Sequence, residues 1–126
     1  MPYRNFVLID DDEDDHEIFC AAVKSISPSI DFTTFFDASE ALVKLGQMDV
    51  PPDVIFLDLN MPIMNGQQFL TLIKKDINLQ NIPVIIFTTS SNVSAIRATK
   101  DLGAHDFITK PSSFDEIVIL LKPLFS

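Results

Sequence analysis

The stretch VIFLD at residues 54–58 places four consecutive apolar residues directly before an aspartate. A continuous apolar run of this length is typical of a strand in a parallel sheet, because helices cover both faces of such a sheet. Two similar runs, FVLI at residues 6–9 and VIIF at residues 84–87, are also followed at once by polar side chains. The three runs therefore predict the central strands of one parallel sheet.

Two weaker strand candidates, DFTTFF at residues 31–36 and DFIT at residues 106–109, extend this pattern. Amphipathic segments lie between the strands. In the first of them, apolar side chains recur at three- and four-residue spacing from Phe19 to Ile26, and Pro28 follows. The strand–helix unit thus occurs five times. This order predicts an α/β fold of the (βα)5 type, a doubly wound five-stranded parallel sheet with helices on both faces and right-handed crossovers.

Capping and helix-breaking residues predict where several helices begin and end. Ser39 is expected to cap the second helix, which would end near Gly46. The last helix is expected to start near Ser112 or Ser113, and Pro123 should end or kink it. The apolar stripe of the third helix is predicted to consist of Phe69, Leu70, Ile73 and Ile77.

Length and composition limit the classes of protein that this chain can belong to. Its 126 residues suffice for one domain, so residues 1–126 are predicted to form a single domain with no output domain after Ser126. The formal net charge of −9 disfavours binding to nucleic acid or to an anionic membrane. No targeting segment is visible, and we expect a cytoplasmic protein. The one cysteine, Cys20, has apolar neighbours and is interpreted as a small core residue.

Polar side chains follow the predicted strands at their carboxyl ends, where ligands bind in open α/β sheets. Asp10 and Asp11 follow the first run, Asp58 the second and Thr88 the third, and Lys110 follows the last strand candidate. Three carboxylates this close together require a cation. The lysine supplies one positive charge. Mg²⁺, which prefers carboxylate, water and phosphate oxygens, would supply two more.

An aspartate between a magnesium site and a lysine is a suitable nucleophile for a phosphoryl group. Phosphoryl transfer depends mainly on positioning and charge neutralisation, which Mg²⁺, Lys110 and the Thr88 hydroxyl would provide around Asp58. An all-oxygen ligand set does not suit zinc. His16 and His105 lie in unrelated elements and do not form a metal pair.

Four segments carry these residues in order: VLIDDDEDD at 7–15, VIFLDLNMPIMNG at 54–66, IPVIIFTTSS at 82–91 and FITKP at 107–111. The Asp-Asp pair, the D-x-N-M-P-x-M-x-G loop, the threonine and the Lys-Pro pair all occur at compatible spacing. With them the chain resembles, over its full length, the receiver domains of response regulators in bacterial two-component systems. The resemblance implies a flavodoxin-like receiver fold in a single-domain regulator of the chemotaxis type.

The resemblance also implies that Asp58 is the phosphoacceptor. Asp10, Asp11 and Asp58, with the backbone carbonyl of Asn60, would hold Mg²⁺. The phosphoryl group would come from a histidine kinase or a histidine phosphotransfer protein, and the phosphorylated protein would dock to a downstream protein target. In that role the chain is not an enzyme with a separate substrate, although it assists its own phosphorylation and dephosphorylation.

The same resemblance implies a switch made of Thr88 and Phe107. Thr88 and Lys110 would contact the phosphoryl group, and Phe107 would swing inward when Thr88 moves. The Lys110–Pro111 peptide bond is expected to be cis. Gly66 is interpreted as a position at which the backbone requires glycine.

The apolar residues of the final helix, residues 117–121 and Leu124, cover more than one face. An exposed helix normally keeps its apolar residues on one side. We therefore expect this helix, with the fourth helix and the fifth strand, to form a docking or homodimer surface. A helix packed more deeply than usual would explain the same pattern.

Several other interpretations compete with the switch. A magnesium-dependent phosphatase of the haloacid dehalogenase type would carry Asp-x-Asp where this chain has Asp58-Leu59-Asn60. An interaction module that works without phosphate would not need the full set of acidic, threonine and lysine residues. A nucleotide-binding domain would need a glycine-rich loop. Residues 12–15 (DEDD) lack the glycine and the closing glutamate of an EF-hand, and are interpreted as a solvated first helical turn.

Overall fold

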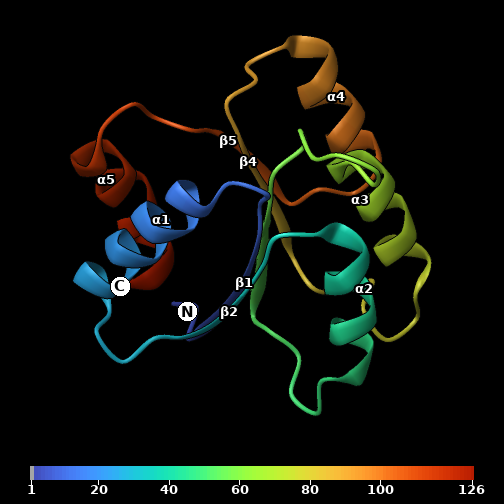
Figure 1. Ribbon diagram of the computed structural model, residues 1–126, viewed down its shortest axis with the longest axis horizontal. Coiled ribbons are helices and arrows are strands. Elements are labelled where there is room, and N and C mark those ends of the chain that lie inside the picture. Colours follow the sequence, from blue (N-terminus) through green and yellow to red (C-terminus); the bar gives the residue numbers. More distant parts are fainter. Residues whose placement is uncertain (1) are drawn as a thin grey trace.

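The predicted alternation of strands and helices is confirmed in the computed structural model, which describes residues 2–126 (Figure 1). The strands are β1 (Asn5–Ile9), β2 (Asp31–Phe35), β3 (Val54–Leu57), β4 (Val84–Thr88) and β5 (Asp106–Thr109). The helices are α1 (Glu13–Ile26), α2 (Ala38–Gln47), α3 (Gly66–Lys75), α4 (Val93–Asp101) and α5 (Phe114–Phe125). All strand pairs are parallel, and the sheet order is β2-β1-β3-β4-β5.

This strand order creates a point at which the chain changes direction across the sheet. From β1 the chain passes to the edge strand β2 and then returns to β3 on the other side of β1. Figure 1 shows α1 and α5 on one face of the sheet and α2, α3 and α4 on the other. In doubly wound sheets, ligands bind beyond the carboxyl ends of the two strands that flank this point, which here are β1 and β3.

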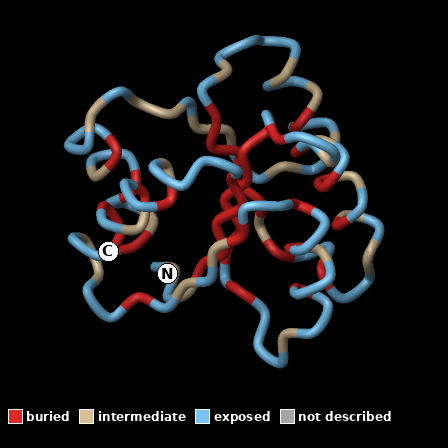
Figure 2. Tube along the Cα trace, viewed as in Figure 1, coloured by how far each residue is buried: buried red, intermediate tan, exposed pale blue. Residues whose placement is uncertain are grey.

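The central strands are buried almost completely, as their apolar runs predict. Apart from Asn5, every residue of β1, β3 and β4 is buried, and Figure 2 shows these residues along the centre of the molecule. The edge strands β2 and β5 mix exposed and partly buried residues, and of their residues only Phe35 at the end of β2 is buried. Continuous apolar runs therefore mark the strands covered on both faces, and mixed runs mark the edges.

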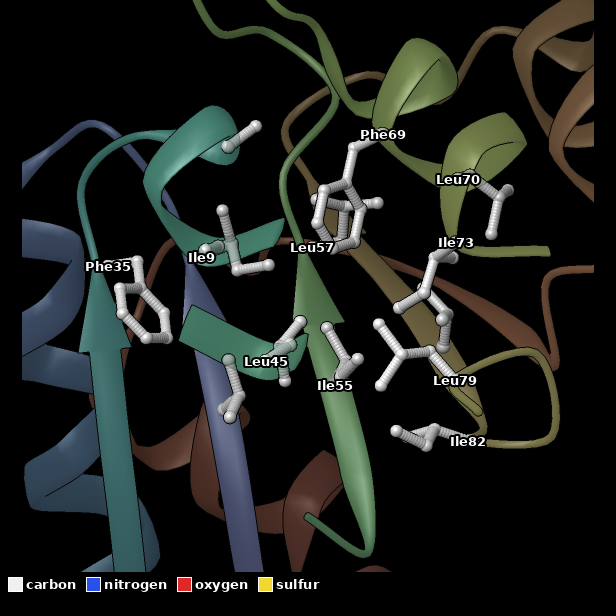
Figure 3. Packing of buried hydrophobic residues seen from close by; sticks show 14 of the residues in the cluster. Ile9, Phe35, Leu45, Ile55, Leu57, Phe69, Leu70, Ile73, Leu79 and Ile82 are labelled. Carbon is white, nitrogen blue, oxygen red and sulfur yellow. The ribbon is translucent and has the colours of Figure 1, made fainter. Parts of the chain in front are cut away.

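Two hydrophobic cores lie on opposite faces of the sheet. On the face covered by α2 and α3, side chains from the strands meet those from the helices; Figure 3 labels Ile9, Phe35, Leu45, Ile55, Leu57, Phe69, Leu70, Ile73, Leu79 and Ile82. The face covered by α1 and α5 is rich in aromatic residues, among them Phe6, Phe19, Phe56, Phe87 and Phe125. Cys20 is half-buried against this second core, where burial raises the pKa of its thiol. This placement agrees with its interpretation as a core residue.

Two predicted details of the middle helices are wrong. The N-cap of α2 is Asp37, whose carboxylate accepts a hydrogen bond from the backbone N–H three residues later, rather than Ser39. The helix begins earlier because Ala38 is buried against the core and belongs to its first turn. Helix α3 ends at Lys75, so Ile77 lies beyond its apolar stripe and is 79% exposed.

Helix α5 begins after its N-cap Ser113, as predicted, but Pro123 does not end it. The helix continues to Phe125, whose ring lies 5.6 Å from that of Phe6 in the aromatic core. The carbonyl of Leu124 also accepts a hydrogen bond from the backbone N–H of Tyr3 at 2.9 Å. Burial of the aromatic ring and this backbone contact hold the last turn in place despite the proline.

The outer face of α5 exposes apolar side chains, as the sequence pattern indicates. Ile117 and Leu121 are buried, whereas Ile119 is 69% exposed and Leu120 is 42% exposed. Within residues 2–126, none of the helices combines the length and the apolar character needed to cross a lipid bilayer.

Gly66, the first residue of α3, is pressed against the backbone that carries Asp58. A Cβ atom at this position would lie 2.5 Å from the carbonyl oxygen of Asp58 and 2.8 Å from the Cα atom of Leu59. Both are backbone atoms, which do not shift cheaply. The interpretation of Gly66 as a backbone requirement is therefore confirmed.

We predict that Gly66→Ala and Gly46→Ala change stability in opposite directions. The first should destabilise the fold by about 1 to 3 kcal/mol, the usual cost of forcing extra volume into a packed site. Gly46 lies in α2, and a Cβ atom added there would meet no other atom within 4 Å, so alanine should stabilise by about 0.5 to 1 kcal/mol through helix propensity. Urea unfolding of both variants measures the two effects. A stabilising Gly66→Ala would contradict the close contact.

Candidate functional site

The three predicted carboxylates meet at the carboxyl edge of the sheet. Asp10 follows β1 and Asp58 follows β3, and the two strands are paired in register up to Ile9 and Leu57. Asp10, Asp11 and Asp58 each offer an oxygen within 4.8 Å of those of the others. Asp10 and Asp58 are buried, while Asp11 is exposed. The strand pairing therefore converts two distant sequence positions into one acidic cluster.

Lys110 reaches this cluster from the end of β5. Its Nζ lies 2.7 Å from Oδ2 of Asp10 and 3.5 Å from Oδ2 of Asp58. The strand pairing positions the lysine, because its backbone N–H donates to the carbonyl of Thr88 at 2.7 Å. The lysine side chain is only 9% exposed, so these charges interact in a largely desolvated setting.

The pKa values of Asp10 and Lys110 reflect their burial and their contact with each other. Burial raises the pKa of Asp10 above that of an ordinary aspartate, although hydrogen bonds from Lys110 and from the backbone N–H of Asp12 limit the rise. Burial alone would lower the pKa of Lys110. Its hydrogen bonds to Asp10 and Asp15, together with the charges of Asp10 and Asp58, outweigh this effect, and the pKa lies above its usual value. Lys110 is therefore a permanent cation at neutral pH.

The acidic cluster fits a hard divalent cation. One ammonium faces the carboxylates of Asp10 and Asp58, and Asp11 adds a third negative charge on the exposed side. The clustered ligand atoms are all carboxylate oxygens, which Mg²⁺ prefers, and the exposed carboxylate leaves room for the waters that Mg²⁺ retains. The residues thus suit the ion that the sequence predicts.

Asn60 connects Asp58 with Thr88. The Asn60 amide nitrogen lies 3.4 Å from the Thr88 hydroxyl, and the Asn60 backbone N–H is 3.4 Å from Oδ1 of Asp58. The side chain of Thr88 is completely buried. Asn60 therefore links the Thr88 hydroxyl to Oδ1 of the phosphoacceptor candidate, whereas Lys110 contacts its Oδ2. The role of the Asn60 carbonyl as a metal ligand stays a prediction.

Phe107 lies in β5, which β4 separates from β3 and the acidic cluster, and it is partly buried. It packs against the core on the α2–α3 face. It also lines a hollow of about 290 Å³ between α4 and β5, together with Ile96 and Ala104. The hollow gives the ring space to move, which suits the switch predicted from Thr88 and Phe107.

The predicted cis peptide bond before Pro111 is wrong, since no peptide bond between the described residues 2–126 is cis. The backbone of Lys110 still pairs with β4, and the N-cap Ser113 of α5 follows only three residues later. The chain therefore passes from strand to helix through this short segment with a trans bond.

The interpretation of residues 12–15 as a solvated helical turn holds for three of them but not for Asp15. Asp12 is the N-cap of α1, and Glu13 and Asp14 are exposed. Oδ2 of Asp15 lies 2.8 Å from Nζ of Lys110, almost as close as Asp10. The sequence held a signal for this contact, because Asp15 precedes the buried Phe19 by four residues and so borders the buried face of the helix.

His16 is a second residue whose place near the site the sequence did not indicate. It is 5% exposed, its ring stacks on Phe36 with centroids 4.1 Å apart, and Nε2 lies 2.6 Å from the backbone carbonyl of Asp10. A carbonyl only accepts hydrogen bonds, so this contact places a proton on Nε2. His16 thereby holds the turn between β1 and α1 from which Asp10 and Asp11 project.

A five-stranded parallel sheet in the order 2-1-3-4-5 with an acidic cluster at its switch point defines a flavodoxin-like α/β domain of the receiver class. Residues 6–122 match the response regulator receiver domain family, and the chain belongs to that family.

Individual relatives agree with this assignment. Response regulator Rcp1 of Synechocystis sp. is 25% identical over 130 aligned positions, which cover 99% of this chain and 88% of Rcp1. The crystal structure of the Mn(2+)-bound form of Rcp1 has a TM-score of 0.84 and covers 95% of this chain and 90% of the other. The structure of the phosphorylated cyanobacterial phytochrome response regulator RcpA has a TM-score of 0.87 at 29% identity, covering 96% and 90%.

A more distant structure supports the fold alone. Chemotaxis protein CheY4 of Vibrio cholerae is 22% identical, with a TM-score of 0.81 and coverage of 98% of this chain and 99% of that one. Several other curated relatives are longer proteins, and the chain spans less than half of their length.

Proposed function

We propose that this receiver domain is a phosphorylation switch in a two-component system. Asp58 accepts one phosphoryl group from a histidine kinase or a histidine phosphotransfer protein, and the phosphorylated domain signals by docking to a downstream protein. The observation that carries the proposal is the position of the buried Asp58 carboxylate, which lies 3.5 Å from Nζ of Lys110 and has an oxygen within 4.8 Å of those of Asp10 and Asp11.

The chain's own residues provide the positioning that this reaction needs. An oxygen of the Asp58 carboxylate attacks the phosphorus of a phosphohistidine; the new P–O bond forms as the P–N bond breaks, and the imidazole leaves. Lys110, which lies 3.5 Å from Asp58, and the Thr88 hydroxyl, which is linked to Asp58 through Asn60, would stabilise the oxygens of the phosphoryl group. Mg²⁺ held by Asp10, Asp11 and Asp58, with the backbone carbonyl of Asn60, supplies charge neutralisation to the same oxygens when it is bound.

The readout is proposed to be a two-state change at Thr88 and Phe107. A phosphoryl group draws the Thr88 hydroxyl toward it, and Phe107 moves into the space released near α4 and β5. Phosphorylation shifts the equilibrium between the two conformations only if it stabilises one of them more than the other. The size of the shift equals that difference in free energy. The exposed apolar residues of α4 and α5, which include Val93 and Ile119, form the surface proposed to dock a partner or a second copy.

Two relatives support the proposal by their chemistry. One is described as phosphorylated and another as bound to Mn(2+), an ion with ligand preferences close to those of Mg²⁺. We propose that the chain works as a cytoplasmic response regulator. It would have no separate substrate and no direct contact with nucleic acid or membrane, in keeping with its net charge of −9.

Intact-mass measurement after incubation with Mg²⁺ and acetyl phosphate tests the proposal. The parent protein should gain one acid-labile phosphoryl group, Asp58→Asn should gain none, and chelation of Mg²⁺ should prevent the gain. Asp49→Asn removes an aspartate that follows α2, away from the acidic cluster, and should leave the gain unchanged. A folded, Mg²⁺-bound parent that is never modified would instead indicate a phosphate-independent docking module. Continuous hydrolysis of a generic phosphoester would indicate a phosphatase.

A further inference from the structure

Lys110 is shared among three carboxylates in the unmodified protein, and the phosphoacceptor is the most distant of them. Its Nζ lies 2.7 Å from Asp10, 2.8 Å from Asp15 and 3.5 Å from Asp58. We propose that Asp15 is a positioning residue that holds Lys110 away from Asp58 and so weakens the binding of a phosphoryl group at the site. This inference rests on the proposed function.

Asp15 is well placed to hold the lysine. It lies in the first turn of α1, where its backbone N–H donates to the side chain of the N-cap Asp12 at 3.2 Å. Its Cα position is therefore fixed by the helix, while its side chain is 36% exposed and can follow the lysine only over a short distance. The ammonium has three hydrogen bonds to donate; Asp10 and Asp15 accept two of them at short range, and Asp58 accepts the third at 3.5 Å.

A phosphoryl group on Asp58 changes what the lysine must do. The group brings additional negative charge and oxygens that need a cation. Lys110 then either gives up the contact with Asp15 or pulls that carboxylate toward the phosphoryl oxygens. The first course costs an ion pair, and the second brings like charges together. Both courses raise the energy of the phosphorylated state relative to the unmodified one, so Asp15 opposes phosphorylation.

The neighbouring carboxylates do not share this role. Asp14 belongs to the same helical turn but is exposed, and no contact joins it to Lys110. Asp14 therefore acts on the site only through its long-range electrostatic field, as other nearby acidic residues do. Salt screens this field. Comparing the effects of substituting Asp15 and Asp14 therefore isolates the direct contact of Asp15 with Lys110.

Beryllium trifluoride, an anion that mimics the phosphoryl group on an aspartate, serves as the probe. Its dissociation constant is measured by calorimetry at saturating Mg²⁺ for the parent, Asp15→Asn, Asp14→Asn and Asp15→Glu. Asp15→Asn should bind the anion about two to five times more tightly than the parent, the range expected for losing a partly exposed ion pair. Asp14→Asn should change the affinity by less than about twofold. Asp15→Glu keeps the charge and should return the affinity toward that of the parent.

The outcomes separate this inference from the proposed function. Equal affinities of Asp15→Asn and Asp14→Asn, or weaker binding by Asp15→Asn, would overturn the role of Asp15 while leaving the phosphorylation site intact. A parent protein that binds no beryllium trifluoride in the presence of Mg²⁺ would overturn the proposed function and this inference with it. Tighter binding by Asp15→Glu would also contradict the inference, because it would show that a carboxylate at this position does not oppose the anion.

Discussion

Replacing Lys110 with alanine is expected to lower the free energy of unfolding by about 3 to 5 kcal/mol at neutral pH in the absence of divalent cations, which is the usual cost of removing one partner of a buried ion pair. The reason lies in the residues left behind. Asp10 is 1% exposed and Asp58 is 8% exposed, and without the ammonium no cation in the described part of the chain compensates them. Urea unfolding in the presence of a chelator measures the loss.

The stability deficit of Lys110→Ala should shrink as the pH falls. Burial already raises the pKa of Asp10 in the parent, and removal of the lysine removes the hydrogen bond that limits this rise. A carboxyl whose pKa is higher in the folded than in the unfolded state binds more protons when folded, so the folded state gains stability as the pH is lowered from about 7 to about 5. Added Mg²⁺ should reduce the deficit in the same way, by supplying the missing charge.

An exposed lysine provides the matched control. Lys44→Ala in α2 removes the same charge and side chain at an exposed position and should change stability by less than about 0.5 kcal/mol, without the pH trend. A Lys110→Ala variant that is as stable as Lys44→Ala at neutral pH would show that the carboxylates are hydrated or protonated rather than buried as charges.

Phe6→Ala is expected to destabilise the protein by about 3 to 5 kcal/mol, the range for deleting a buried phenylalanine side chain. Phe6 is 1% exposed, and its ring centroid lies 5.3 Å from those of Phe19 and Phe32, 5.6 Å from that of Phe125 and 6.0 Å from that of Phe56. These rings come from two helices and two other strands, so the Phe6 side chain contacts most of the elements that form the aromatic core. Collapse of the cavity would displace several elements at once.

The same substitution at a surface position tests whether this cost comes from the cavity. Phe114→Ala removes a ring that is 44% exposed at the start of α5 and should cost less than about 1 kcal/mol. The midpoints of urea unfolding compare the two variants, and an unchanged slope shows that the unfolding reaction itself is the same. Equal losses in the two variants would contradict the picture of a core centred on Phe6.

The central part of the fold could be predicted because its signals are local. Each buried strand is a continuous apolar run, and the polar residue that ends each run must lie at the same edge of a parallel sheet. This pattern alone predicts that Asp10, Asp58, Thr88 and Lys110 share that edge. The structure brings all four together.

The residues that sequence reasoning missed depend on contacts between distant elements. The contact of Asp15 with Lys110 depends on how α1 lies over the sheet edge, and that of His16 depends on the path of the chain after β2, where Phe36 covers the imidazole. Pro123 does not end α5 for the same kind of reason, since burial of Phe125 outweighs a local preference. Tertiary packing decided each of these points.

The long distance along the sequence between Lys110 and its carboxylate partners also matters while the protein is being synthesised. Lys110 follows Asp10 by 100 residues and Asp58 by 52, and α5, which completes the aromatic core, comes later still. At a typical 5 to 20 residues per second, Asp10 leaves the ribosome roughly 5 to 20 seconds before the lysine does. Until β5 has emerged and paired with β4, a growing chain holds carboxylates without their cation. We therefore expect unfinished copies not to compete with complete ones for phosphoryl groups.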